Sequence, residues 1–471
     1  MADSLKFGTS GLRGLAVDLL GRPSAAYATA FLRYLEASKA IRPGAEVLVG
    51  RDLRESSPEI AVSVTRAIAA AGFSPVDCGE VPTPALALYA QTRQAPAIMV
   101  TGSHIPADRN GLKFYIAERE ITKADEAGIL AALKTGRAAF RNAVSARPAP
   151  EARQAYLDRY IGAFGEDTLV GMKIGVFQHS SVARDDLTAI LGALGAETVP
   201  LGRVDHFVPI DTEALSTADA AQADVWVRAE HLDALVSTDG DGDRPLVADE
   251  KGAFIRGDVL GILTAGFLGA DAVVTPVTSN SSIEGLGTFG RVVRTKVGSP
   301  FVIAGMADAS ATGARTVVGF EANGGALLGS DVRIGKGTIT ALPTRDALLP
   351  ILCVLAASKQ RGLTLSQLVA TLPSRVARSD RLEHVPQERT AALLGKLVNA
   401  DFAAPYFADA GTVQSVSSLD GLRFELTSGD VVHYRASGNA PELRCYTEAA
   451  TAERADALLA WGLKAAEKVV R

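Results

Sequence analysis

Short apolar strand signals alternate with Ala-rich helical stretches, and this alternation constrains the fold more than any other feature of the chain. A strand signal at Glu46–Gly50 is followed by a helical pattern that opens at Ser57 and Pro58 and stops at Gly72. A second strand signal follows at Phe73–Asp77. A strand, a helix and a second strand in this order predict a βαβ unit.

The same alternation returns twice further along the chain. It is seen at Lys173–Phe177, Asp185–Leu194 and Glu197–Pro200, and again at Val259–Leu268, Ala272–Pro276 and Arg315–Gly319. After Pro373 the pattern changes to a helix near Gln387–Leu397, three short strands and a final helix after Thr451. The sequence therefore predicts an α/β protein of four domains, at residues 1–149, 150–251, 252–372 and 373–471, the first three βαβ-type and the last α+β.

Composition narrows the class of protein. A chain of 471 residues exceeds what one hydrophobic core supports, and 47% hydrophobic residues suit a folded globule. The balance of 48 basic against 53 acidic residues contains no long run of either sign, so neither a nucleic-acid nor a membrane partner is expected. The three cysteines lack paired spacing and the first residues lack a signal-peptide pattern, which favours a cytoplasmic protein.

The segment Ser237–Pro245 reads STDGDGDRP and comes directly after an apolar strand signal. Its aspartates can turn their oxygens onto one hard cation such as Mg²⁺, because the intervening glycines let the loop close tightly. A solvated acidic turn is the alternative, but carboxylates this close repel one another unless a cation neutralises them. The segment predicts a metal site at Asp239, Asp241 and Asp243.

A second polar turn, TGSHIP at 101–106, follows the strand signal Ala97–Val100. A turn of small residues at a strand end can expose a hydroxyl at the edge of the sheet. Ser103 is therefore a candidate nucleophile, with His104 beside it and Lys113 available to balance phosphate charge. An ordinary serine turn is the alternative for this segment read alone.

Two further segments carry groups that suit a phosphorylated sugar. Residues 434–444 set a guanidinium, a hydroxyl, an amide and backbone N–H groups around a glycine turn, and such groups hold a phosphate dianion. Residues 319–325 place Glu321 and Asn323 after a strand, and these side chains are natural partners for vicinal sugar hydroxyls. A plain turn remains the alternative for each segment alone.

Five motifs taken in chain order resemble those of the α-D-phosphohexomutases. They are FGTSGLRG at 7–14, which we expect to form a glycine-punctuated loop, TGSHIPADRNGLKFY at 101–115, DGDGDR at 239–244, GFEANGG at 319–325 and RASGNAPELRCYTEA at 435–449. The resemblance spans nearly the whole chain, and it implies four domains around a central cleft.

The resemblance also implies roles for individual residues. Ser103 would carry the phosphoryl group, and the three aspartates would bind Mg²⁺ together with an oxygen of that phosphoserine. Arg13, Lys113 and Arg244 would lie near the transferring phosphate. Glu321 would hold sugar hydroxyls, and the phosphate that is not reacting would be held by Arg435, Ser437, Gly438 and Asn439.

The reaction that the resemblance implies is an isomerisation by phosphoryl transfer. Phosphoserine would give its phosphate to mannose 6-phosphate or mannose 1-phosphate, and the hexose 1,6-bisphosphate would turn round and return the other phosphate. The same bisphosphate is the expected activator. Glucose phosphate is the alternative substrate, or a second one, because the two sugars differ only at C2. A hexose phosphate is the expected partner, and a monomer and a homodimer are both compatible with the sequence.

Two departures from the family pattern leave the general base open. The family's sugar motif usually ends in Ser-Gly-His, whereas Asn323-Gly324-Gly325 stands here, and a segment that commonly ends in His ends here in Ser299. His104, Lys113 and Lys296 are the candidates, because each has a titratable nitrogen near the inferred reaction centre.

Two other mechanisms compete with the mutase hypothesis. A strand that ends in Asp-x-Asp also opens the haloacid-dehalogenase type of site, in which Asp239 itself would be the nucleophile. The missing histidines are alternatively compatible with a sugar-phosphate binding protein that has lost catalysis. Both leave the serine motif without a purpose.

Overall fold

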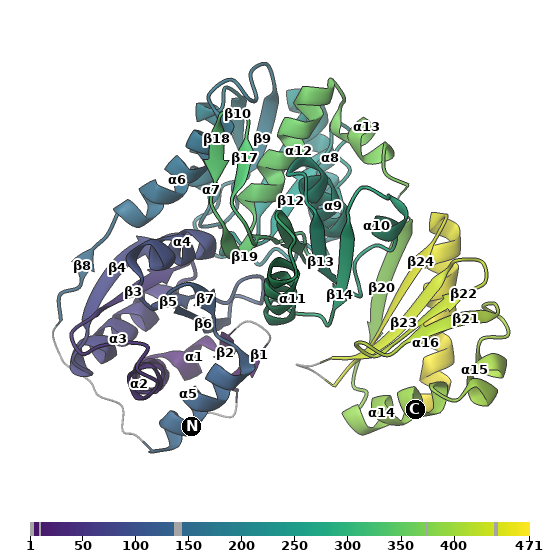
Figure 1. Cartoon of the computed structure of the whole chain (residues 1–471), viewed down its shortest axis with the longest axis horizontal. Helices are drawn as coiled ribbons and strands as arrows, with labels where there is room; N and C mark the ends of the chain where they lie inside the picture. The colour runs from purple at the N-terminus through teal and green to yellow at the C-terminus, as the bar shows by residue number, and fades with distance from the viewer. Residues whose placement is uncertain (1–3, 9–10, 136–143, 374, 438–440) are drawn as a thin grey trace.

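The computed structural model describes residues 4–8, 11–135, 144–373, 375–437 and 441–471. Its sheets and helices form four units arranged in an arc, with the first and fourth units at opposite ends (Figure 1). Each sheet falls within one of the four predicted segments, and the boundaries at 149, 251 and 372 stay predictions.

The first unit holds an eight-stranded mixed sheet in the order β1-β2-β6-β5-β3-β4-β8, with β7 paired to β6. The strands are β1 Lys6–Gly8, β2 Gly11–Leu15, β3 Glu46–Arg51, β4 Ser74–Glu80, β5 Ala97–Val100, β6 Arg109–Ile116, β7 Arg119–Glu120 and β8 Arg147–Pro148. The helices are α1 Ala16–Leu19, α2 Arg22–Ala37, α3 Ser57–Ala70, α4 Thr83–Arg93 and α5 Lys123–Thr135, and α6 Glu151–Phe164 leads to the second unit.

The expected loop at residues 7–14 is wrong for the described part of this segment. Lys6–Gly8 and Gly11–Leu15 pair as an antiparallel hairpin, and β2 continues the sheet by pairing with β6, Leu12 opposite Leu112. The strand exists because β6 supplies a partner nearly 100 residues away, which no local pattern reveals.

The second unit follows the predicted alternation of strand, helix and strand. In the third unit the order is wrong, because Val259–Leu268 lies mainly in helix α9 and Ala272–Pro276 is strand β13. The second sheet has the order β10-β9-β11-β12, and the third has β14-β13-β15-β16-β19. The second unit contains β9 Lys173–Phe177, α7 Arg184–Ala193, β10 Glu197–Leu201, α8 Thr217–Glu230, β11 Ala234–Thr238 and β12 Pro245–Ala248. The third contains α9 Gly257–Phe267, β13 Ala272–Pro276, α10 Ser282–Gly285, β14 Arg291–Thr295, α11 Ser299–Ala311, β15 Val317–Phe320, β16 Ala326–Leu328, β17 Val332–Ile334, β18 Gly337–Ile339, β19 Leu342–Asp346, α12 Leu348–Arg361 and α13 Leu365–Ala370.

The fourth unit is an antiparallel sheet in the order β20-β24-β23-β22-β21 with three helices. Its elements are β20 Val376–Leu382, α14 Gln387–Leu397, α15 Ala400–Tyr406, β21 Val413–Ser417, β22 Leu422–Leu426, β23 Val431–Ala436, β24 Leu443–Ala449 and α16 Ala452–Val470. The predicted α+β class of this unit is confirmed. Its three predicted strands are β21, β22 and β23, whereas the sequence pattern does not predict β20 and β24.

The first three units share a hydrophobic core, whereas the fourth unit has its own, and this difference bears on how the units can move. One buried apolar cluster runs through the first three units and includes Leu48, Val236 and Leu352. The fourth unit packs its own cluster around Phe424 and Tyr434. The third and fourth units are joined by polar bonds. Asn280 Nδ2 donates to the Arg375 carbonyl at 2.6 Å, and Ser281 Oγ donates to Glu448 at 2.5 Å.

Among the described residues, no helix combines the length and apolar content that a membrane crossing requires.

Two buried histidines are held neutral inside the second and fourth units. The Nε2 atom of His179 lies 2.9 Å from the carbonyl of Thr238, and that of His433 lies 2.6 Å from the carbonyl of Asp420. The Nδ1 atom of each ring is buried without a partner in the described part of the chain. Burial lowers the pKa of each histidine from 6.5 to about 4. Each ring therefore donates one hydrogen bond and has no acceptor for a second proton.

These histidines predict acid lability. Below pH 6.5 the unfolded chain takes up a proton at each site, whereas the folded chain does so only near pH 4. Stability should fall as the pH falls through this window, by about 3 kcal/mol for each histidine. Urea unfolding across the window should show a shallower pH dependence for His179→Gln and His433→Gln than for the wild type. The exposed His206→Gln is the control, and equal pH dependence in all four proteins would contradict the assignment.

Candidate active site

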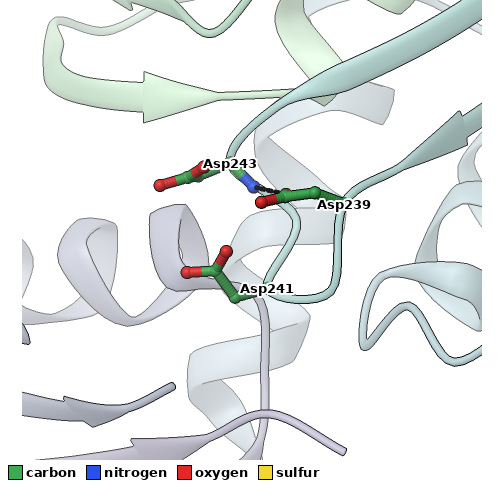
Figure 2. A group of neighbouring side chains, drawn as sticks. All are labelled: Asp239, Asp241 and Asp243. Atoms are coloured by element: carbon green, nitrogen blue, oxygen red, sulfur yellow. Dashed lines mark hydrogen bonds between the residues drawn. The ribbon is translucent and has the colours of Figure 1, made fainter. Parts of the chain in front are cut away.

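Three aspartates converge at the turn between β11 and β12 (Figure 2). We call residues 239–244 the metal loop. Backbone N–H groups of Asp243 and Arg244 donate to Asp239 Oδ1, both at 3.2 Å, and so fold the loop over that carboxylate. The three side chains are buried, and one oxygen from each lies within 4.8 Å of the others. The predicted cluster is therefore brought together.

The aspartate cluster fits a hard divalent cation. Oδ1 of Asp241 and Oδ1 of Asp243 are buried and have no hydrogen-bond partner among the described residues. Burial, together with repulsion from Asp241 and Asp243, raises the pKa of Asp239 well above its usual range. Buried carboxylate oxygens without donors are costly unless a cation binds them, and three oxygen ligands with further open positions suit Mg²⁺.

Ser103 faces this cluster from the first unit. It lies in the serine loop, residues 101–106, which begins where β5 ends. Its Oγ donates to Asp239 Oδ2 at 2.6 Å, and its side chain is fully buried. The backbone φ of Ser103 is +55°, in the left-handed region that L residues rarely adopt, and strain of this kind concentrates at functional sites.

The metal loop and the serine loop approach closely because position 240 is glycine. A Cβ on Gly240 would lie 2.9 Å from the carbonyl oxygen of Ser103 and 2.7 Å from the ring of Phe207. Both distances are shorter than real Cβ contacts, so the approach of the serine hydroxyl to the aspartates requires this glycine.

Arg54 holds the serine loop from beneath, and sequence reasoning missed it. Its side chain is fully buried, its Cζ lies 3.9 Å from the centre of the Phe207 ring, and its Nε lies 3.3 Å from Asp52 Oδ2. Its two terminal nitrogens donate to four backbone carbonyls at 2.6 to 2.9 Å, those of Ser103, Ile105, Pro106 and Arg109. One guanidinium thus fixes the backbone from Ser103 to Arg109.

Arg54→Gln should be severely destabilising. The change leaves Asp52 buried without its cation and removes the donors to the loop carbonyls, and breaking a buried ion pair costs about 3 to 5 kcal/mol. Arg51→Gln is the matched control, because Arg51 is the last residue of β3, three positions before Arg54, and makes partly exposed pairs with Asp77 and Glu80. In urea unfolding, the control variant should lose less than about 1 kcal/mol of the free energy of unfolding. Equal losses in the two variants would refute the clamp.

Four cations surround the aspartates and the serine. Nζ of Lys113 lies 2.6 Å from both Asp241 Oδ2 and Asp243 Oδ2. The guanidinium of Arg345 lies 2.8 Å from Asp243 Oδ2, and Nε of Arg244 lies 3.7 Å from Asp243 Oδ1. Burial lowers the pKa of Arg13 to about 10, and repulsion from Arg244 and Arg345 adds to the effect. Cations that repel one another in a buried site favour a bound anion.

The three candidate bases have different surroundings. Nδ1 of His104 lies 3.3 Å from Ser103 Oγ, and burial, with repulsion from Arg244 and Arg13, holds the His104 pKa far below its usual range. Lys113 commits its N–H groups to two aspartates, which favours charge balance over proton abstraction. Lys296 is exposed, and its Nζ lies 6.0 Å from the centre of the Phe301 ring.

The sugar loop, residues 319–325, meets the metal loop through Arg345. Glu321 accepts from Arg345 Nη1 at 2.8 Å, and Asn323 Oδ1 accepts the N–H of Gly325 at 2.9 Å, which closes the turn. Thr212 Oγ1 of the second unit donates to the Asn323 carbonyl at 3.2 Å. A pocket beside the loop has walls from three units, which include Thr212, Glu213, Arg256, Ala322, Arg378 and Tyr446.

Ser299 does not substitute for the family's histidine as a base. Its hydroxyl donates to Glu120 Oε2 at 3.0 Å, and Thr344 Oγ1 donates to the other oxygen of the same carboxylate at 2.7 Å. The serine therefore joins β7 of the first unit to α11 of the third. Its role in the structure is a contact between units.

The phosphate loop, residues 435–444, is described in part. Nε of Arg435 donates to Asp420 Oδ2 at 2.8 Å, and the backbone N–H of Ser437 donates to the Glu442 carbonyl at 3.0 Å. Asp420 also accepts the N–H of Val297 at 2.9 Å, so this loop is tied to the third unit. Gly438 and Asn439 lie outside the described residues.

Comparison with known proteins identifies the family. The sequence matches "Phosphoglucomutase/phosphomannomutase, alpha/beta/alpha domain I" at residues 4–139 and domain III of the same family at residues 256–376. It is 49% identical to a phosphomannomutase of Sinorhizobium fredii (strain NBRC 101917 / NGR234), over 97% of this chain and 98% of that protein. This chain belongs to the phosphoglucomutase/phosphomannomutase family.

Further comparisons agree with the assignment to the phosphoglucomutase/phosphomannomutase family. A phosphomannomutase of Salmonella muenchen is 43% identical over 96% of this chain and 93% of that protein. The fold matches that of a phosphoglucomutase/phosphomannomutase family protein of Burkholderia thailandensis with a TM-score of 0.77, 22% identity and 98% coverage of both chains. The predicted resemblance and fold class are confirmed.

In this member of the phosphoglucomutase/phosphomannomutase family, Arg345 and Arg54 are the site residues that sequence reasoning missed. Arg345 carried a usable signal, because Thr344-Arg345-Asp346 interrupts an otherwise apolar stretch from Leu342 to Ala357 with two charges. A buried charged pair inside an apolar run points to a functional or structural partner elsewhere. Arg54 carried no comparable signal, because it lies in an ordinary polar loop after β3.

Proposed function

We propose that this protein is a phosphomannomutase, which interconverts mannose 6-phosphate and mannose 1-phosphate through a phosphorylated Ser103. The observation that carries the proposal is the Ser103 hydroxyl, buried 2.6 Å from an aspartate of a cation-binding cluster. The two relatives at 49% and 43% identity support mannose as the sugar.

Phosphoryl transfer needs positioning and charge stabilisation more than covalent chemistry. In the first half-reaction the free hydroxyl of the hexose phosphate attacks phosphorus and the bond from phosphorus to Ser103 Oγ breaks. The hydroxyl proton passes to a base, for which His104 and Lys296 remain the candidates. The second half-reaction is the reverse, from the other end of the sugar. Hexose 1,6-bisphosphate is thus the intermediate and the expected activator.

The chain's own groups have distinct tasks in this reaction. Asp239, Asp241 and Asp243 would hold Mg²⁺, which would draw charge from a phosphoryl oxygen when bound. Arg13, Lys113 and Arg244 would face the transferring group and stabilise the charge that spreads over its oxygens. Glu321 would accept hydrogen bonds from sugar hydroxyls, with Asn323 beside it in the same loop.

The distal phosphate would be held by the fourth unit, through Arg435, Ser437, Gly438 and Asn439. Turning the bisphosphate requires a clamp that can release it. The separate core of the fourth unit supports movement of this unit as a body, because opening would break polar contacts and leave both cores intact.

The three buried free cysteines, Cys78, Cys353 and Cys445, support a cytoplasmic location, since a reducing compartment keeps such thiols free. A hexose phosphate is the proposed partner.

The function is tested by initial rates with mannose 1-phosphate and with glucose 1-phosphate. Turnover is monitored by phosphorus NMR in the presence of Mg²⁺ and catalytic hexose 1,6-bisphosphate. Mannose 1-phosphate should be converted to the 6-phosphate, and the faster of the two rates should be with mannose. Comparable rates would make the enzyme dual in specificity. Hexose-phosphate binding without turnover of either sugar would contradict the proposal.

A further inference from the structure

Strand β19 presents its side chains in two directions. Successive residues of a strand point to opposite faces. Thr344 reaches Glu120 of the first unit, and Asp346 accepts hydrogen bonds from Tyr156, at 2.6 Å, and from Tyr160 of α6. Arg345, between them, points the other way and enters the site.

The backbone at Arg345 is fixed by its neighbour. Besides binding the two tyrosines, Asp346 Oδ1 accepts the N–H of Leu348 at 2.9 Å, at the start of α12. Asp346 is buried, as are both tyrosine rings. A side chain that projects from such an anchored strand end loses little further freedom when it binds, which suits a positioning role.

The guanidinium of Arg345 spans two loops that belong to different units. Nη1 donates to Glu321 Oε2 of the sugar loop at 2.8 Å. Nη2 and Nε donate to Asp243 Oδ2 of the metal loop, at 2.8 and 3.2 Å. The side chain of Arg345 is only 4% exposed, so these bonds form away from water, where orientation is strongly enforced.

Gly325 makes room for this arginine. A Cβ at position 325 would lie 2.8 Å from Cδ of Arg345 and 2.8 Å from the carbonyl oxygen of Asp243. A larger residue at 325 would therefore collide with the arginine and with the metal loop. With Arg345 and the metal loop in these positions, the histidine that the family's Ser-Gly-His pattern places at 325 would not fit.

We propose that Arg345 is a positioning residue that holds Glu321, and through it the sugar, in register with Asp243 of the metal loop. The inference rests on the proposed function, because Glu321 is taken to bind the sugar. It gives Arg345 a task that charge alone does not explain. The planar guanidinium can bind one carboxylate through Nη1 and the other through Nη2 and Nε. A lysine ammonium at the same position is a single point charge on a different side chain.

The test compares Arg345→Lys and Arg345→Met with the wild type. The dissociation constant of mannose 6-phosphate is measured calorimetrically in EDTA, and kcat and KM are measured with Mg²⁺. Both variants should bind the sugar phosphate about 10-fold to 100-fold more weakly without metal and should show a lower kcat, as expected for loss of a group that orients a ligand. Arg345→Lys should keep a melting temperature near that of the wild type, since the charge is retained.

Arg291→Met is the matched control. Arg291 begins β14 of the same third unit, and its Nη1 donates to Thr312 Oγ1 at 2.8 Å, a bond that involves none of the site loops. It should leave both binding and kinetics unchanged. Wild-type binding and kinetics in Arg345→Lys would show that only charge is needed and would overturn the inference while leaving the proposed function intact. A wild type that neither binds nor turns over hexose phosphate would overturn the proposed function, and the inference with it.

Discussion

Ser103→Ala should abolish mutase activity, with a fall in kcat of about 10⁴-fold or more, because removing a nucleophile leaves only binding and charge stabilisation. The hydroxyl is positioned to carry the phosphoryl group, because it lies 2.6 Å from Asp239 and Arg54 binds the carbonyl of the same residue. Coupled assays of mannose 1-phosphate turnover measure the loss. The fold should be retained, since the substitution removes one oxygen.

Ser63→Ala controls for the loss of a buried serine hydroxyl in the same unit. Ser63 lies on α3, and its Oγ donates to the carbonyl of Glu59 within the helix. Its variant should keep wild-type rates. Substantial turnover by Ser103→Ala would show that another group accepts the phosphate, with Asp239 the leading alternative.

Asp241→Asn should weaken Mg²⁺ binding by more than about 100-fold, because even the partners of metal ligands cost 10-fold to 100-fold when removed. Activity at fixed Mg²⁺ should fall with it. The carboxylate of Asp241 is fixed by Thr83 Oγ1 at 2.5 Å and Lys113 Nζ at 2.6 Å, so the amide can occupy the same place without the charge. Titration calorimetry with Mg²⁺ on the isolated protein measures the binding directly.

The matched control for Asp241→Asn is Asp249→Asn. Asp249 lies just beyond β12, at the far end of the same hairpin, and accepts the N–H groups of Lys251 and Ala253 in a turn. Its variant should bind Mg²⁺ as the wild type does. Unchanged Mg²⁺ affinity in Asp241→Asn would remove the aspartate cluster from the metal site.

The sequence predicts the strands where apolar runs are short, buried and bounded by glycine or polar turns. Ala97–Val100 and Lys173–Phe177 have the predicted bounds. The hairpin of β1 and β2 was not predictable in this way. It depends on β6, which pairs with β2 from far along the chain and gives a glycine-rich segment its extended form.

For the candidate site, the motifs predicted which groups meet, and the structure brings together Ser103, Lys113 and the three aspartates. The residues that hold them were not predictable. Arg54 donates to backbone carbonyls, and a sequence pattern does not indicate which carbonyls a side chain will bind. Arg345 binds residues 24 and 102 positions away, and only the fold specifies such distances.

Peptide mapping of the protein after incubation with hexose 1,6-bisphosphate would locate the phosphoryl group. The label should lie on Ser103, survive hydroxylamine and be discharged by mannose 6-phosphate. A label on Asp239 that hydroxylamine removes would identify an aspartyl nucleophile and contradict the mechanism proposed for this protein.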